Sequence, residues 1–598
     1  MIAPLLSILL VLLPAPAPAA PTWDGPLSTR GRYIVDAHGD RFKLKSVNWH
    51  GASGTFDGTG HHAGEDSGRI PLGLDRAPLD EIVAGLRDVG ANSVRLPFSS
   101  EMVHDQQPVT DAAVAANPEL RGLTPLAVYD QVVAALTGAG LAVILNNHTN
   151  TTRWCCGVDG NERWNTSQST SDWEETWLTM VRRYRDNRRV VGADLYNEVR
   201  RSVWDDPNWG LGDDHDWYAA SQHLGDRILR EANPDLLIIV EGINWTGVPV
   251  DGFAHERPTL KPVRTLSHTL AVSGQLVYSA HFYGYTGPNH SGATGAGETT
   301  DPRYHDLTRT QLFDVLYRDA FYVSAETGRH FTAPVWISEF GVGGNEPAGS
   351  AERAWFGNFV DYLIQADADF AYWPAVGWAE KRASNGWALL YWDRSGARSS
   401  VASDWRASDW SRLIAAPGLA GPVPTPVRWS MLSPDHGDFN ASRPVTGDWD
   451  VGARKAACPD GQRLIGLSHT GNRGLCTDTG GGIAWTSFAV VTDERYVTAD
   501  WAPGYTKLQC PAGGRLIGYA VRGAAVSSAL CAAGTAGAAA GRTVWFDRGD
   551  NRPAGEPGGD FAYGRYKGQC AGDEYAAGIA YTGRFGSART PDALYCRG

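Results

Sequence analysis

Two short stretches decide the fold: Gly192–Val199, GADLYNEV, and Val335–Gly341, VWISEFG. Each is an apolar run of strand length that carries a glutamate near its end, Glu198 in the first and Glu339 in the second. Such runs between turn residues are typical of buried strands. If both strands belong to one parallel barrel, the two glutamates lie at its carboxyl-terminal mouth, where such barrels place functional groups. Either glutamate alone is equally compatible with a solvated loop acid or an ion-pair partner.

The same strand pattern recurs through most of the chain, and amphipathic helical stretches alternate with it. This alternation predicts an α/β fold, a (β/α)8 TIM barrel, over residues 21–416 of the 598. The expected strands are Phe42–Asn48, Asn92–Pro97, Leu141–Asn147, Gly192–Glu198, Leu236–Glu241, Gln275–Phe282, Val335–Gly341 and Phe370–Trp373. The expected helices are Leu79–Val89, Pro125–Ala139, Trp173–Asp186, Trp217–Glu231, Thr308–Ala325 and Ala351–Ala366.

The composition changes after the barrel. Residues 417–427, PGLAGPVPTPV, are rich in Pro and Gly and are predicted to be a linker. Residues 428–598 then contain one motif three times, Asp-Trp/Phe-x-x-Gly-x-x-Lys-x-x-Cys, beginning at Asp448, Asp500 and Asp560. A threefold repeat of this kind predicts a small all-β domain with a pseudo-threefold axis, either a trefoil or a prism-like assembly.

Six of the eight cysteines lie in these repeats. Small β units with thin cores need covalent cross-links, so we expect the pairs Cys458–Cys476, Cys510–Cys531 and Cys570–Cys596. The other two, Cys155 and Cys156, are adjacent. We predict a vicinal disulfide between them, which is strained because neighbouring Cα atoms are only about 3.8 Å apart. No CxxC or HxxxH spacing indicates a metal site.

The amino terminus has the pattern of a secretory signal. Residues 2–20, IAPLLSILLVLLPAPAPAA, are an apolar stretch followed by small residues, so we expect removal of residues 1–20. The run is too short and too interrupted by Pro to span a membrane. A net charge of −13 without a basic tract argues against nucleic acid as a partner. The expectation is a secreted, extracellular protein that is monomeric and carries no membrane segment once mature.

Polar and aromatic residues stand at the ends of the expected strands. Arg95 lies within an apolar strand, and a buried arginine needs an acidic partner. Two carboxylates that face each other across a barrel mouth suit cleavage of a glycosidic bond, because one acid protonates the leaving oxygen while one carboxylate meets the anomeric carbon. The other candidates follow in chain order: Trp49, His148, Asn197, His281, Tyr283 and Trp373.

This ordered set resembles glycoside hydrolase family 5, the cellulase-like retaining hydrolases, over most of residues 30–410. The Asn197-Glu198 pair precedes Val199, where the family pattern has proline, which bears on the subfamily more than on activity. The resemblance implies that Glu339 is the nucleophile and Glu198 the acid/base. It also implies roles for the other residues. Arg95 and Tyr283 hold Glu339, Asn197 binds the sugar 2-OH, and His148 and His281 bind hydroxyls or orient the glutamates. Trp373 lies beneath the sugar, and Trp49 and Trp378 line further subsites.

The activity expected from this set is double-displacement hydrolysis of a β-linked polysaccharide or oligosaccharide, most simply endo-cleavage of β-1,4-glucan, with no cofactor and no metal. One alternative is an exo-acting β-glucosidase or β-mannosidase. Another is a non-catalytic carbohydrate-binding protein, which has no need for both Glu198 and Glu339. For residues 428–598 we expect a carbohydrate-binding module, with a structural appendage as the alternative.

Overall fold

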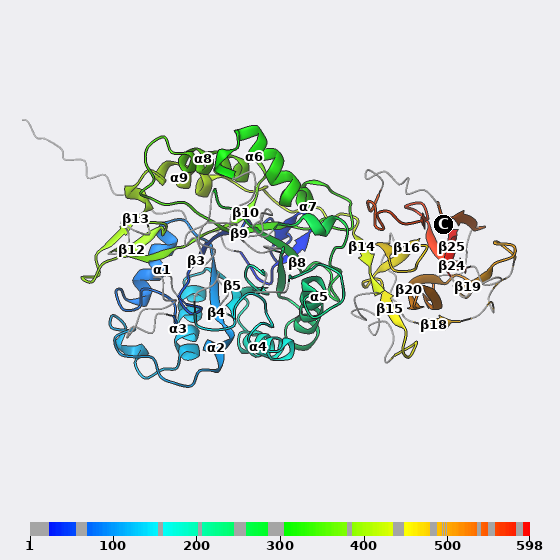
Figure 1. Ribbon diagram of the computed structural model, residues 1–598, viewed down its shortest axis with the longest axis horizontal. Helices are drawn as coiled ribbons and strands as arrows, with labels where there is room; N and C mark the ends of the chain where they lie inside the picture. The colour runs from blue at the N-terminus through cyan, green and yellow to red at the C-terminus, as the bar shows by residue number, and fades with distance from the viewer. Residues whose placement is uncertain are drawn as a thin grey trace, which may run out of the picture.

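The computed structural model describes residues 23–54, 68–153, 160–200, 202, 206–243, 259–284, 304–379, 386–434, 448–478, 487–492, 494, 497, 499–534, 540–547, 557–581 and 590–598. A body of strands and helices lies beside a smaller body made of strands, which contains the carboxyl terminus (Figure 1). The predicted signal at residues 1–20 and the predicted Cys155–Cys156 disulfide lie outside the described residues.

The predicted barrel is confirmed. Eight parallel strands close in the order β10-β3-β4-β5-β6-β7-β8-β9, and nearly all of their side chains are buried. Most strand boundaries differ by one to three residues, and the difference that bears on the site is that β6 ends at Asp194, so that Glu198 lies in the segment after the strand and not at its last residue. The barrel strands are β3 (Lys45–Asn48), β4 (Ser93–Ser99), β5 (Ala142–Thr149), β6 (Val190–Asp194), β7 (Leu237–Glu241), β8 (Leu276–His281), β9 (Val335–Phe340) and β10 (Asp369–Tyr372).

Helices surround the barrel, and polar side chains fix where several of them begin. Ser169 and Thr308 form capping boxes at α4 and α6, which satisfy backbone N–H groups of the first turn. Among the described residues, no helix has both the length and the apolar character that a membrane span needs. The helices are α1 (Leu79–Asp88), α2 (Ser100–His104), α3 (Pro125–Gly138), α4 (Thr170–Arg183), α5 (Trp217–Arg227), α6 (Arg309–Leu316), α7 (Tyr322–Ala325), α8 (Ala351–Gln365) and α9 (Ala407–Ala415), with π-helical turns at Ile228–Ala232 and Tyr317–Phe321.

Two small sheets accompany the barrel. The hairpin of β1 (Ser28–Arg30) and β2 (Tyr33–Val35) precedes the first barrel strand. Ile34 of this hairpin shares an apolar cluster with Ala142 and Val277, which stand at the amino-terminal ends of their strands. The hairpin therefore covers the barrel end opposite the predicted site. The second sheet consists of β11 (Val376–Trp378), β12 (Leu390–Trp392) and β13 (Arg398–Ser400).

The carboxyl-terminal repeats form three four-stranded antiparallel sheets, which confirms the predicted all-β region. Each repeat gives its first strand to the sheet of another repeat: β15 pairs with β20, β19 with β24, and β23 with β16. This exchange closes a ring of three, so no repeat completes its sheet alone. The sheets are β14 (Trp429–Leu432), β17 (Gly474–Asp478), β16 (Gln462–Ser468) and β23 (Lys567–Gln569); β15 (Arg454–Ala457), β20 (Arg515–Arg522), β21 (Ala525–Ala532) and β18 (Phe488–Val491); and β19 (Thr506–Gln509), β24 (Tyr575–Tyr581), β25 (Pro591–Arg597) and β22 (Arg542–Trp545).

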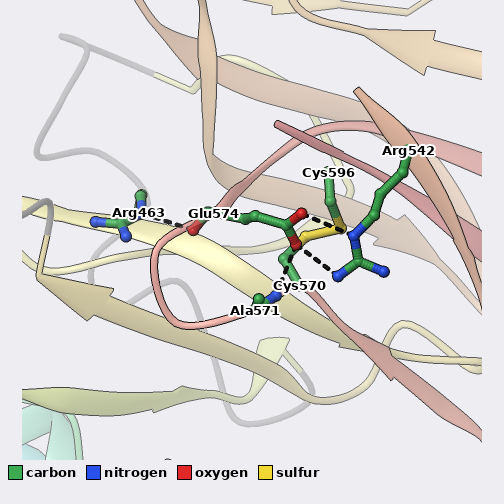
Figure 2. The surroundings of a disulfide bond; sticks show 6 residues. All are labelled: Arg463, Arg542, Cys570, Ala571, Glu574 and Cys596. Atoms are coloured by element: carbon green, nitrogen blue, oxygen red, sulfur yellow. Dashed lines mark hydrogen bonds and ion pairs between the residues drawn. A yellow bond between two sulfur atoms is a disulfide. The ribbon is translucent and has the colours of Figure 1, made fainter. Parts of the chain in front are cut away.

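The three predicted disulfides within the repeats are confirmed. Each joins two sheets, because the first cysteine follows the exchanged strand and the second lies in the repeat's own hairpin. In Figure 2, Glu574 lies beside the Cys570–Cys596 bond, where its carboxylate accepts hydrogen bonds from Arg542 and the N–H of Ala571. The disulfides therefore reinforce the ring where neighbouring sheets meet.

The repeated motif has a structural basis in each copy. Its lysine is buried and forms an ion pair with its own aspartate, at 2.9 Å for Lys455 and Asp448. The second and third copies repeat this contact at 2.9 and 2.7 Å. Each lysine also donates to a carbonyl of the intervening turn, as Lys455 does to Ala453 at 2.7 Å. A buried ammonium needs such partners, and so the motif fixes the turn before each exchanged strand.

The two bodies are in contact. Thr269 of the barrel donates to the carbonyl of Met431 in β14 at 2.8 Å, and the N–H of His330 donates to the carbonyl of Gly558 at 2.9 Å. His330 is 5% exposed, and its Nδ1 lies 2.8 Å from the hydroxyl of Ser267. Burial lowers the pKa of His330 to about 3. This imidazole is therefore neutral over most of the acidic range.

We predict that His330 makes the protein less stable in acid. In the unfolded chain His330 has an ordinary pKa of about 6.5 and is protonated below that pH. In the folded protein it stays neutral down to about pH 3. Folding free energy is therefore lost as the pH falls from 6.5 towards 3, by about 3 kcal/mol at pH 4. His330→Asn, which retains a partner for Ser267, should lose less stability than wild type between pH 7 and pH 4 in urea unfolding. Parallel losses in both proteins would contradict this prediction.

Candidate active site

Glu198 and Glu339 face each other at the carboxyl end of the barrel. One carboxylate oxygen of each, together with one ring nitrogen of His281, lie within 4.8 Å of one another. Glu339 is held near the end of β9. Glu198 has φ of 46°, a conformation that side chains other than glycine rarely adopt, and its N–H donates to Glu241 Oε2 at 2.8 Å. Backbone strain of this kind persists only where surrounding contacts impose it, and it is concentrated at functional sites.

The guanidinium of Arg95 is completely buried and has several acceptors. It donates from Nε to Asp194 and from Nη1 to Glu339, both at 2.6 Å. It also donates to the side-chain oxygens of Asn197, at 2.9 Å, and Asn48, at 3.1 Å. Burial alone would lower the pKa of Arg95, but the neighbouring carboxylates reverse this and raise it above its ordinary value. Arg95 is therefore a fixed positive charge that orients Glu339 and Asn197 together.

Tyr283 completes the setting of Glu339. Its hydroxyl donates to Glu339 Oε2 at 2.8 Å, while Arg95 donates to Oε1. Since each oxygen has its own donor, the plane of the carboxylate is fixed. Trp387, which is half-buried, lies beside Tyr283 with ring centroids 6.0 Å apart.

His281, at the end of β8, lies between carboxylates on both sides. Its Nδ1 is 2.8 Å from Glu198 Oε1, and its Nε2 is 2.8 Å from Glu241 Oε1 and 2.9 Å from the hydroxyl of Ser338. Glu339 lies 3.7 Å from Nδ1. Burial alone would lower the pKa of His281, but the charges of Glu241 and Glu339 and the hydrogen bond to Glu198 raise it to about 10. His281 is therefore an imidazolium with a donor on each nitrogen.

Two aromatic planes form another side of the site. His148 stacks on Trp373, with ring centroids 5.2 Å apart and planes 8° from parallel. His148 Nδ1 lies 2.9 Å from Asn146 Oδ1. Burial, followed by the charge of Arg95, lowers the pKa of His148 well below its usual range, so this imidazole is neutral, in contrast to that of His281.

Not every predicted aromatic residue belongs to the site. Trp49 is completely buried and donates from its indole nitrogen to the carbonyl of Leu72 at 2.8 Å. Trp378 and Trp164 are also part of the buried barrel core. The expected subsite contacts of Trp49 and Trp378 are therefore corrected: both side chains pack the core, and neither offers an open face to a sugar. Trp154 lies outside the described residues.

Sequence reasoning missed five polar residues of the site. They support the predicted residues from within the barrel wall, and Asp194 and Glu241 each end a strand that is otherwise apolar. Glu241 gave a usable signal, because it ends the run LLIIVE just as Glu339 ends VWISE. The missed residues are Asn48, Asn146, Asp194, Glu241 and Ser338.

A closed parallel barrel with two opposed, buried glutamates at its mouth defines the site of a glycoside hydrolase. The sequence agrees: the family model Cellulase (glycosyl hydrolase family 5) matches residues 35–377, more than half of the chain. The chain belongs to glycosyl hydrolase family 5, which confirms the resemblance seen in the sequence.

Relatives support the same assignment, and a solved structure supports the fold. The chain is 29% identical over 393 residues to a glycosyl hydrolase 5 family protein of Chamaecyparis obtusa, covering 62% of each chain. It is 29% identical over 359 residues to an endoglucanase of Paenibacillus polymyxa, covering 58% of this chain and 78% of the relative. The fold matches a hyperthermophilic endocellulase of Pyrococcus horikoshii with a TM-score of 0.50 at 23% identity, covering 65% of this chain and 99% of that one.

We predict that Asp194→Asn destabilises the barrel by about 3–5 kcal/mol, because it leaves buried Arg95 short of one charged partner. Urea unfolding measures this loss. Asp186→Asn removes an exposed carboxylate and serves as the control, with a change within about 0.5 kcal/mol. Equal unfolding free energies for the two variants would contradict the role given to Asp194.

Proposed function

We propose that the protein hydrolyses β-linked glucan with retention of configuration, with Glu339 as nucleophile and Glu198 as acid/base. The observation that carries this proposal is the spacing of the two side chains, whose nearest oxygens lie within 4.8 Å. Retaining glycosidases hold their carboxyl groups about 5–5.5 Å apart, whereas inverting enzymes need about 6.5–9.5 Å to admit a water molecule. Nearest oxygens within 4.8 Å of each other favour the shorter spacing.

In the first step, Glu339 attacks the anomeric carbon while Glu198 gives its proton to the leaving oxygen, which breaks the glycosidic bond and forms a glycosyl ester. Arg95 and Tyr283 present Glu339 in a single orientation, as their hydrogen bonds to its two oxygens require. Asn197, anchored through its side-chain oxygen by Arg95, has its amide donors free to meet the sugar 2-OH.

In the second step, Glu198 removes a proton from water, and the resulting hydroxide equivalent displaces Glu339 from the sugar. The charge of Glu339 returns as the ester breaks, so the carboxylate again pairs with Arg95. Trp373 stacks on His148 and is 2% exposed, so in this proposal it meets the pyranose ring through the small part of its surface that stays open. This chemistry is complete without a metal or an organic cofactor.

The relatives bear on the substrate. One is named an endoglucanase, of Paenibacillus polymyxa, and another the major extracellular endoglucanase, of Xanthomonas campestris pv. campestris, 30% identical over 259 residues. We therefore take β-1,4-glucan, cleaved within the chain, as the substrate. Export to the extracellular space fits the three disulfides and the leader-like residues 2–20.

Azide distinguishes the two glutamates. On 2,4-dinitrophenyl β-cellobioside, Glu339→Ala should lose hydrolysis, and added azide should yield the α-glycosyl azide because it occupies the nucleophile's place. With Glu198→Ala, which should slow the reaction by about 10²–10⁴-fold, azide should yield the β-glycosyl azide by attacking the glycosyl ester. Glu119→Ala, at an exposed acid, is the control. If Glu339→Ala gave the β-azide and Glu198→Ala the α-azide, the nucleophile and acid/base assignments would be reversed. If the wild type hydrolysed short aryl β-glucosides or β-mannosides but not β-glucans, the exo-acting alternative would be favoured.

The repeat domain has an aromatic pair, an exposed Trp545 and a half-buried Tyr505, that suits sugar. Trp545 of β22 is 49% exposed and lies edge-on to Tyr505, with ring centroids 5.1 Å apart. Exposed Trp side chains present a rigid flat surface that suits sugar rings. We propose that residues 428–598 bind the polysaccharide through this pair and keep the barrel near its substrate.

Trp545→Ala should reduce binding to insoluble cellulose by about tenfold or more, since loss of a central aromatic contact typically costs more than 1–2 kcal/mol, while hydrolysis of a soluble aryl cellobioside stays unchanged. Leu211→Ala, at a 76% exposed residue of the barrel, is the matched control. Co-sedimentation with cellulose measures both. Wild-type binding by Trp545→Ala would leave the structural appendage as the better account.

A further inference from the structure

Glu241, the last residue of β7, is completely buried and touches the site at two points. One carboxylate oxygen, Oε2, accepts the backbone N–H of Glu198 at 2.8 Å. The other, Oε1, lies 2.8 Å from His281 Nε2. The carboxylate of Glu241 therefore contacts the backbone of Glu198 directly and the side chain of Glu198 indirectly, through the ring of His281.

The first contact fixes the backbone of Glu198. Glu198 has φ of 46°, and a non-glycine residue in this region is held there by its surroundings at a cost of about 1–3 kcal/mol. Burial raises the pKa of Glu241 to about 7, and while Glu241 is ionised the hydrogen bond from the Glu198 N–H is charge-assisted, which is among the stronger contacts available for this purpose. Loss of this hydrogen bond would let the strained backbone at Glu198 relax, which would turn its side chain away from the barrel mouth.

The second contact fixes the side chain of Glu198. His281 Nε2 faces Glu241, and Nδ1 lies 2.8 Å from Glu198 Oε1. Ser338 and Glu339 also border the ring, Asp194 adds negative charge at longer range, and the nearby imidazole of His148 is neutral. A ring that donates from both nitrogens places its Nδ1 proton on Glu198 Oε1. The proton that Glu198 gives to the leaving group then has to stand on its other oxygen, Oε2.

We propose that Glu241 is a positioning residue for the acid/base: it fixes the backbone of Glu198 directly and its carboxyl group through His281. This proposal rests on the assignment of Glu198 as acid/base. The arrangement matches the opposite side of the mouth, where Asp194 stands behind Arg95 and Arg95 behind Glu339. In both halves, a buried cation separates the reacting glutamate from a second buried carboxylate.

Glu241→Gln tests the proposal with little change in volume. An amide has one acceptor oxygen where a carboxylate has two, so the variant can keep the contact to the N–H of Glu198 or the contact to His281 Nε2, but not both. We expect a defect specific to acid/base catalysis. Phenyl β-cellobioside, whose leaving group needs a proton, should be hydrolysed about 10²-fold more slowly in kcat/KM. 2,4-Dinitrophenyl β-cellobioside, which leaves without one, should change in kcat/KM by less than about threefold.

The second half-reaction gives an independent readout. With the dinitrophenyl substrate, slow removal of a proton from water lets the glycosyl ester accumulate, so kcat and KM should fall together in Glu241→Gln. Azide, which needs no base, should then restore kcat. Glu241→Asp keeps the charge and should recover part of the activity on the phenyl substrate.

Asp369→Asn is a matched control. Asp369, the first residue of β10, is also a buried carboxylate that accepts a backbone N–H, that of Leu44 at 2.7 Å, and pairs with a cation, Arg41 at 3.0 Å. It lies at the opposite end of the barrel. Asp369→Asn should lower the stability of the protein but change kcat/KM for the phenyl and dinitrophenyl substrates to the same extent.

Equal slowing of both substrates in Glu241→Gln, or no slowing of either, would overturn the proposal. If wild type hydrolyses neither substrate, the proposed function itself fails, which is a separate outcome. Thermal unfolding of each variant verifies folding, and Glu241→Asp carries the test should Glu241→Gln not fold.

Discussion

The barrel mouth is organised around two cations buried among carboxylates. Arg95 and His281 are both completely inaccessible to solvent, and charged groups in that position require close partners. Arg95 has Asp194 and Glu339, and His281 has Glu198 and Glu241. Because these pairs connect strands β4, β6, β7, β8 and β9, the electrostatic network and the closure of the barrel depend on each other.

This network explains how two glutamates 141 positions apart in the sequence keep one spacing. When both Glu198 and Glu339 are ionised they repel each other, and the cations between and behind them offset this repulsion. The positive φ of Glu198 shows that the chain accepts local strain to complete the arrangement. Strain in the backbone is tolerable where several fixed hydrogen bonds oppose its release.

Much of this was predictable from the sequence. Apolar runs of strand length, each followed by a helical stretch, were sufficient for the barrel, and the polar residues at the run ends indicated the site. The supporting residues were not predictable in the same way. Asp194 and Ser338 lie in largely apolar strands, and a single polar residue in a strand does not show which residue of another strand it contacts. Trp49 failed for the reverse reason: its position after a strand end suggested an open face, but packing against the following loop covers it.

The repeat domain shows the same limit. Its period and its cysteine pairs were visible in the sequence, whereas the exchange of first strands between repeats depends on pairing between distant segments, as between Arg454 and Val521. Because each repeat completes its sheet with a strand of another repeat, the three repeats depend on one another. The three disulfides, each joining adjacent sheets, secure that set.

The stereochemistry of the first product tests the central claim, that the glutamates stand at the distance of a double displacement. Proton NMR of the anomeric signals, recorded during hydrolysis of a cello-oligosaccharide before mutarotation, distinguishes the outcomes. The spacing of Glu198 and Glu339 predicts the β-anomer first. Initial formation of the α-anomer would mean that water attacks the sugar directly, and it would contradict the account.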